Sequence, residues 1–134
     1  MFGRNNKSTI DSLIGKSTSI EGNVRFKGGL RIDGQVKGNV IADSEQVSML
    51  VISEDAKVEG EVRVAHLVVN GEIVGPVFSS ELLELQPKAR ISGDVHYTAL
   101  EMHGGALVSG KLTHSHVEEP VLKLAAPVLA ASGT

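Results

Sequence analysis

The chain has 134 residues with a formal net charge of −3, which argues against a protein that binds nucleic acid through general positive charge. It contains no cysteine, which excludes disulfides, thiolate metal sites and cysteine nucleophiles and fits a reducing cytoplasm. Hydrophobic residues make up 41% and aromatic residues only 3%, so aliphatic side chains must fill the core. No apolar run approaches the ~20 residues of a membrane-spanning helix, and we expect a cytoplasmic protein with at most peripheral membrane contact.

The first segment, residues 1–12 (MFGRNNKSTIDS), is short and polar except at its tip. We expect a disordered tail that contacts the membrane. Met1 and Phe2 could insert at the lipid interface, while Arg4 and Lys7 meet anionic headgroups. The alternative is a tail without a function.

Residues 13–114 repeat one short phrase, an aliphatic residue, any residue, glycine, any residue and a second aliphatic residue, first seen at Ile20–Val24. Aliphatic residues at every second position face one side of a strand. The longest interval between repeats holds residues 42–48 (ADSEQVS), which we expect to form a surface insertion. The glycines, one per repeat, are Gly22, Gly38, Gly60, Gly75, Gly93 and Gly110.

This repeat predicts an all-β parallel solenoid. A strand that bends at a glycine every few residues can wind around an aliphatic axis, with about three short strands per winding. A narrow triangular interior suits stacked aliphatic side chains and explains the scarcity of aromatic ones. Residues 79–85 (SSELLEL) are also expected to form a strand, although their pattern is partly helical.

Asn70-Gly71 supports an antiparallel alternative, because this dipeptide between two apolar runs is a strong hairpin signal. Residues 26–30 can be interpreted in the same way. A small sandwich or barrel would follow. The solenoid is favoured because the glycine phrase recurs with the parity of its flanking residues preserved.

The last segment, residues 115–134, is expected to be a disordered tail. Its apolar stretch, residues 120–127 (PVLKLAAP), is bracketed by two prolines and is a candidate docking peptide for a partner protein, with an inert tail as the alternative. His114 and His116 could form an adventitious metal pair, but the spacing fixes no third ligand. We therefore predict no metal site and no cofactor.

Three segments resemble the bactofilin domain: residues 13–40 (LIGKSTSIEGNVRFKGGLRIDGQVKGNV), 50–77 (LVISEDAKVEGEVRVAHLVVNGEIVGPV) and 82–110 (LLELQPKARISGDVHYTALEMHGGALVSG). The resemblance implies a right-handed parallel β-helix of about six triangular windings, flanked by disordered tails. It also implies a bacterial cytoskeletal protein that polymerises end to end without nucleotide at the inner face of the cytoplasmic membrane. Members of this family support cell shape by positioning other proteins, among them cell-wall enzymes.

End-to-end assembly also follows from the physics of an open solenoid. Each end exposes unpaired backbone groups and the edge of the apolar column, and no capping helix is visible at either boundary. Such an end is a template for another copy, and the contact repeats into a filament. The candidate interface residues of the terminal windings are Ile20, Val24, Phe26 and Leu30 at one end and Leu100, Met102, Val108 and Leu112 at the other.

We therefore predict a non-enzymatic cytoskeletal scaffold. Its partners would be further copies of itself, inner-membrane lipids and a cell-wall enzyme or other cargo, but not nucleic acid. One alternative is a hexapeptide acyltransferase, whose six-residue period begins here but breaks at Gly38 and Asn70, and for which His66 or His103 would be the base. The other is a monomeric adaptor that binds partners through its two tails.

Overall fold

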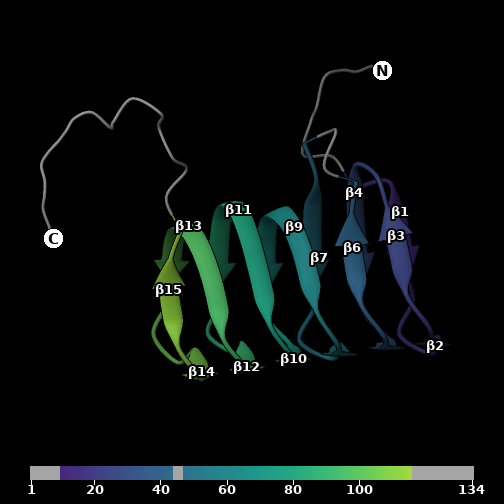
Figure 1. The fold of residues 1–134 in the computed structure, drawn as a ribbon. Helices are drawn as coiled ribbons and strands as arrows, with labels where there is room; N and C mark the ends of the chain where they lie inside the picture. The colour runs from purple at the N-terminus through teal and green to yellow at the C-terminus, as the bar shows by residue number, and fades with distance from the viewer. Residues whose placement is uncertain (1–9, 44–46, 116–134) are drawn as a thin grey trace, which may run out of the picture.

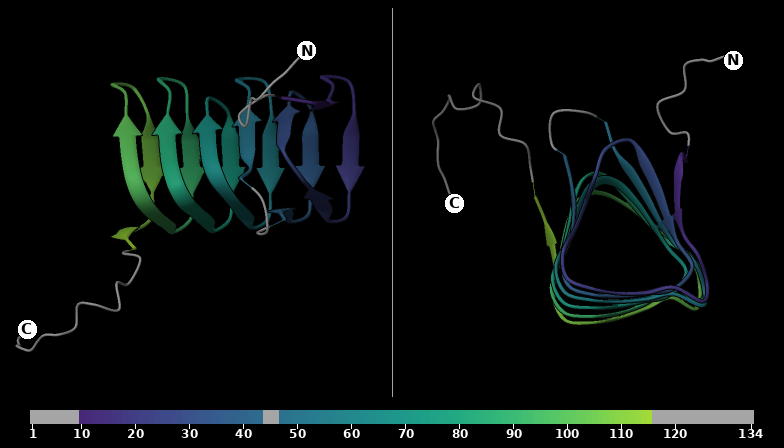
Figure 2. Two further views of the ribbon diagram at one scale, coloured as in Figure 1. Left: turned by 90° about the horizontal axis from the view of Figure 1, so that it is seen from above. Right: turned by 90° about the vertical axis from the view of Figure 1, so that its right-hand side faces the viewer.

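The computed structural model describes residues 10–43 and 47–115. Within these residues every regular element is a β-strand, and all strand pairs are parallel. The chain winds through about six turns, and the view along the axis shows a triangular outline with three flat faces (Figures 1 and 2). The predicted parallel solenoid is confirmed.

Each winding contributes one strand, or half of a longer strand, to each face, and the faces are numbered here in the order of the first winding. Face 1 consists of β1 (Ser12–Ile14), β4 (Gly29–Ile32), β7 (Met49–Ile52) and the second halves of β9 (Val62–Val69), β11 (Val77–Leu85) and β13 (Val95–Met102). Face 2 consists of β2 (Ser19–Glu21), β5 (Gln35–Lys37), β8 (Lys57–Glu59), β10 (Glu72–Val74), β12 (Arg90–Ser92) and β14 (Leu107–Ser109). Face 3 consists of β3 (Val24–Phe26), β6 (Val40–Ala42), the first halves of β9, β11 and β13, and β15 (Leu112–His114).

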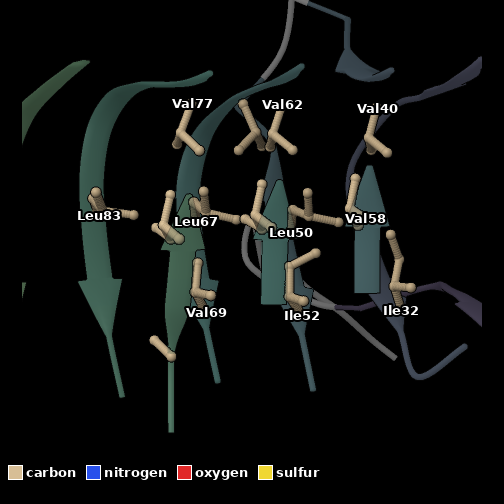
Figure 3. Close-up of a cluster of buried hydrophobic side chains, with 14 of the residues drawn as sticks. Ile32, Val40, Leu50, Ile52, Val58, Val62, Leu67, Val69, Val77 and Leu83 are labelled. Atoms are coloured by element: carbon tan, nitrogen blue, oxygen red, sulfur yellow. The ribbon is translucent and has the colours of Figure 1, made fainter. Parts of the chain in front are cut away.

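The core is a set of aliphatic columns that run parallel to the solenoid axis. On face 1, Leu50, Leu67 and Leu83 occupy matching positions on successive strands, and each is 0% exposed (Figure 3). Because paired strands lie about 4.8 Å apart, each side chain contacts its counterpart in the next winding. The other two faces carry similar columns, Val36, Val58, Ile73 and Ile91 on face 2 and Val40, Val62, Val77 and Val95 on face 3.

The repeated glycines form the corner between faces 2 and 3. Gly60 has a φ of 152°, and a Cβ placed on it would lie 2.2 Å from the carbonyl oxygen of Gly38 in the preceding winding. No other residue fits, because both the backbone angle and the close approach require the absence of a side chain. The glycine phrase therefore marks one corner of each winding.

Asn70-Gly71 forms a corner between faces 1 and 2, not a hairpin. The dipeptide connects β9 to β10, and both strands pair in parallel with the windings on either side. A Cβ on Gly71 would lie 2.2 Å from the carbonyl oxygen of Ser53. The antiparallel alternative is wrong, since a tight turn that reverses a hairpin can equally redirect a strand onto the next face. Residues 26–30 likewise turn the corner from β3 to β4.

Two finer expectations can be compared with the structure. Residues 79–85 lie within β11, so their assignment as a strand is confirmed. The longest interval between glycines does contain an extended connection, between β6 and β7. Its predicted limits were too wide, because Ala42 is the buried last residue of β6 and Ser48 is only 2% exposed.

Asp33 stabilises the corner between faces 1 and 2 in the second winding. The Ser53 hydroxyl and the Arg31 Nε both donate hydrogen bonds to Asp33 Oδ1, the latter at 2.8 Å. These bonds, that from Ser53 above all, lower the pKa of Asp33 from its ordinary value of 3.8. The ionised carboxylate therefore joins the second winding to the third.

We predict that Gly60→Ala destabilises the fold by about 3 kcal/mol or more, because it combines a strained positive φ with a clash against backbone. Gly22→Ala should cost only about 1–3 kcal/mol, since its φ is 131° but no atom lies within 4 Å of the added Cβ. Gly104→Ala, which meets neither restriction, is the matched control. Chemical denaturation followed by circular dichroism gives the three values, and equal losses would contradict the stacked corner.

We predict that Asp33→Asn lowers the free energy of unfolding by about 1 kcal/mol at pH 7. Because the folded-state pKa is lowered, this contribution is present above the unfolded pKa and is lost as the pH falls through the folded pKa. The difference from the wild type should therefore disappear well below pH 3.8. Asp55→Asn, which breaks an exposed ion pair with Lys16, should change little at either pH. A gap for Asp33→Asn that persists in acid would overturn the assignment.

Candidate functional site: the two ends of the solenoid

The two end faces of the solenoid are the candidate site. The first winding consists of β1, β2 and β3, and within residues 10–43 and 47–115 each of these strands pairs with the second winding alone. The last winding consists of the second half of β13 with β14 and β15, and among the described residues it pairs with the fifth winding alone. Each end therefore presents an unpaired row of backbone donors and acceptors.

At the N-terminal end of the solenoid, the apolar side chains of the columns are less buried than in the inner windings. Ile20 begins the column on face 2 and is only partly buried, whereas Val36 and Val58 above it are 0% exposed. Val24 and Phe26 on face 3 are partly buried in the same way. In the part of the chain that the structure describes, no further winding covers them at this end.

At the C-terminal end of the solenoid, the apolar side chains are even more exposed. Met102 is 46% exposed, whereas Leu85, its counterpart in the fifth winding, is 0% exposed. Leu112 is 40% exposed and Val95 beneath it is 0% exposed. Two further candidates of this end are partly buried, Leu100 and Val108.

Leu30 does not belong to an end. It lies in the second winding, pairs with Ser12 of β1 and is only 3% exposed. The sequence assigned it to the first winding because the strand that covers it, β1, has no glycine phrase of its own. The same omission hid Ile14, which begins a face 1 column beneath Ile32. Ile14 precedes Ile20 by the same interval that separates Ile52 from Val58, and this match was the signal that could have revealed it.

The remaining sequence candidates for binding lie mostly outside the described residues. These are Met1, Phe2, Arg4, Lys7, His116 and residues 120–127. His114 lies in β15, where its Nε2 is 2.9 Å from the carbonyl oxygen of Thr98. In the described ranges no three histidine or acidic side chains are grouped as metal ligands. Those ranges also contain no helix with the length and apolar character needed to cross a bilayer.

The two histidines considered as enzymatic bases are not brought together. His66 lies on the outside of face 1 in the fourth winding. His103 follows β13, and its Nε2 is 3.9 Å from a carboxylate oxygen of Glu84. The open hollow beside Ser53, with Arg31 on its wall, is lined by neither histidine.

The corner glycines from Gly22 to Gly93 use their backbone amides in hydrogen bonds between windings. The amide of Gly38 donates to the carbonyl oxygen of Glu59, and that of Gly60 donates to Val74, both at 2.9 Å. A phosphate-binding loop needs such amides free to face the ligand. These glycines instead join one winding to the next.

The sequence matches the family described as "Bactofilin: Polymer-forming cytoskeletal" over residues 12–113. It is 24% identical to Bactofilin BacO of Myxococcus xanthus (strain DK1622) over 111 residues, which cover 83% of this chain and 85% of the relative. It is 26% identical to Bactofilin BacP of the same organism over 112 residues. That match covers 83% of this chain but only 45% of BacP.

The fold is similar to a solved filament structure. The match is to a chain in a cryo-EM reconstruction of Thermus thermophilus bactofilin double helical filaments, with a TM-score of 0.66 and 29% sequence identity. It covers 78% of this chain and 99% of the other. The relative is therefore matched along nearly its whole solved length.

Proposed function

Because the chain belongs to the bactofilin family of polymer-forming cytoskeletal proteins, we propose that it assembles end to end into filaments through its two terminal windings. The observation that carries this proposal is the uncovered state of the apolar columns at both ends. Met102 and Leu112 are 46% and 40% exposed, where the same columns are fully buried one winding further in. A second copy would supply the missing cover.

The burial of these ends would favour assembly. Covering several hundred Å² of apolar surface contributes about 10 kcal/mol before the costs of association are subtracted. The unpaired strand edges add backbone hydrogen bonds, as they do between windings. Because each copy has two such ends, the contact repeats along an open filament.

This assembly needs no nucleotide. Its driving force is the burial of surface that every folded copy already exposes, so no chemical step is required to switch it on. The engaged amides of Gly38 and Gly60 support the same conclusion, since they leave no phosphate cradle at the glycine corner.

The filament would serve as a scaffold at the inner face of the cytoplasmic membrane, for cell shape or protein positioning. Met1 and Phe2 with Arg4 and Lys7 would bind the lipid surface weakly in one copy, but a filament presents many copies and gains avidity. Residues 120–127 would dock a cargo protein such as a cell-wall enzyme. Since the Thermus relative forms double helical filaments, we extend lateral pairing of two filaments to this chain.

We predict that Leu112→Glu abolishes filaments while leaving the protomer folded. The substituted carboxylate would be buried without a partner at the end-to-end contact, whereas Leu112 is 40% exposed in the single copy. Phe26→Asp should act in the same way at the opposite end. Electron microscopy and sedimentation of nucleotide-free protein measure the result.

Val74→Glu is the matched control, because Val74 is 38% exposed on the outside of an inner winding. It should leave filament length and the sedimented fraction unchanged. Filaments of normal length from both end variants would contradict the proposal. A wild-type chain that remains monomeric, or forms a closed trimer, would contradict it as well.

We predict that removal of residues 2–7 prevents sedimentation of filaments with anionic liposomes. The deletion takes away Phe2, Arg4 and Lys7, and with them the apolar and electrostatic contributions to lipid binding. End-to-end assembly should be unaffected. Unchanged co-sedimentation at equal filament content would show that this segment does not bind the membrane.

A further inference from the structure

We propose that face 1 is the surface through which two copies of this chain pair side by side, with their solenoid axes antiparallel. The inference rests on the proposed function, because it assigns a surface and a direction to the lateral pairing of filaments. The strand register brings the outward-facing residues of each face together.

Face 1 carries an apolar patch on its outer surface. Val51 of β7 and Val68 of β9 are paired neighbours that point away from the core. Two positions along the same strands, Met49 and His66 are paired, and Leu82 of β11 follows next to His66. All five side chains are partly buried. The patch, defined as Met49, Val51, Val68 and Leu82, spans three adjacent windings.

Face 2 offers no comparable surface. Its outward positions carry charges on successive strands, among them Lys57, Glu72 and Arg90. The exposed side chains of Lys57 and Glu59 form an ion pair at 3.2 Å. Such a face favours solvent over a dry contact with another protein.

The aromatic surface of face 3 is already used within the chain. The Arg63 guanidinium lies 4.0 Å from the centroid of the Phe78 ring, and that ring stacks on His96 with centroids 4.7 Å apart. Arg63 also pairs with Glu61. Face 1 is therefore the face of the described solenoid whose outer apolar side chains gather in one patch, with His66 between Met49 and Leu82 and no acidic, lysine or arginine residue inside it.

The charges at the edges of the patch are arranged with opposite signs. Along the column of Val51 and Val68, the next strand toward the first winding carries Arg31 and the next strand toward the last winding carries Glu84. Glu101 follows Glu84 on β13. One edge of the patch thus carries Arg31, which is paired with Asp33, and the other edge carries two carboxylates.

The positions of these charged residues favour one relative orientation of the two solenoid axes. A two-fold axis parallel to the strands, passing between β7 and β9, places Val51 against Val68 of the second copy. It also places Arg31 against Glu84 of the second copy. Leu82 then lies opposite Gly29 of the second copy, because Gly29 and Leu82 occupy the same column of outward-facing positions. Parallel copies would instead set Arg31 near Arg31 and Glu84 near Glu84, which is repulsive. In an isologous antiparallel contact, Arg31 of each copy lies against Glu84 of the other, so opposite charges meet at both edges of the patch.

Arg31 retains the capacity for this contact. Its Nε donates to Asp33, but a guanidinium has five N–H donors in a planar fork. Its side chain is 50% exposed, and that of Glu84 is 25% exposed. Both groups can therefore pair across the interface without breaking the fold.

The test is electron microscopy of full-length filaments, scored for paired against single fibres, with sedimentation as the measure of end-to-end assembly. Val68→Glu should reduce paired fibres by about tenfold, because it buries an unpaired carboxylate at the centre of the contact. Val74→Glu is the matched control, since it makes the same change in the same winding but on face 2. It should leave pairing unchanged.

A charge exchange tests the direction. Arg31→Glu and Glu84→Arg should each reduce pairing, and the double variant R31E/E84R should restore it, because the two new charges meet across an antiparallel contact. Absence of restoration while both single variants lose pairing would overturn the antiparallel arrangement. Circular dichroism checks that each variant remains folded.

The outcomes separate this inference from the proposed function. Wild-type chains that form no fibres would contradict end-to-end assembly itself. Wild-type fibres that are single, or V68E fibres that pair as in the wild type, would overturn the role of face 1 and leave end-to-end assembly standing. If V68E reduces liposome binding but not pairing, the patch faces lipid, and the inference is likewise wrong.

Discussion

The close approach of one glycine to the next at the corner between faces 2 and 3 is the contact on which the solenoid depends. Gly60 lies so near to Gly38 that a Cβ would be 2.2 Å from its carbonyl oxygen. This contact holds every winding at the spacing of paired strands and in the same rotational position. Inward-facing side chains consequently stack on similar side chains of the neighbouring windings. This is why branched aliphatic residues fill the interior and aromatic residues are scarce. Register, burial and composition all follow from this corner.

The interactions that stack one winding on the next contain nothing that would end the stacking. A winding is joined to the next by parallel backbone hydrogen bonds and aliphatic contacts, and nothing in these interactions distinguishes a winding of the same chain from one of another copy. The columns simply end, at Ile20 on one side and at Met102 and Leu112 on the other. In the proposed end-to-end assembly, filament formation is a continuation of folding across the chain boundary.

Features with a local signal could be predicted from the sequence, and those that depend on register could not. The glycine phrase and the alternating aliphatic residues lie within a few positions of one another, so the fold could be predicted, and most of the candidate interface residues lie in the terminal windings. Asn70-Gly71 has the same local signature in a hairpin and in a solenoid corner, which left the antiparallel alternative open. Leu30 was misplaced because β1 has no glycine to mark it. The patch of face 1 was missed because Val51 and Val68 become neighbours only through strand pairing.

The corner between faces 3 and 1 differs along the molecule, and this difference has a mechanical consequence. In the first two windings the chain breaks there into separate strands, β3 and β4, then β6 and β7, whereas β9, β11 and β13 continue around it. Their ladder is interrupted only by a register shift between Ser79 and Leu82. Continuous strands carry their backbone hydrogen-bond ladder around the corner and transmit load through it. Where the strands are interrupted, side-chain contacts must transmit the load. Each protomer should therefore be stiffer toward its C-terminal end, so that a long filament bends at regularly spaced, softer segments.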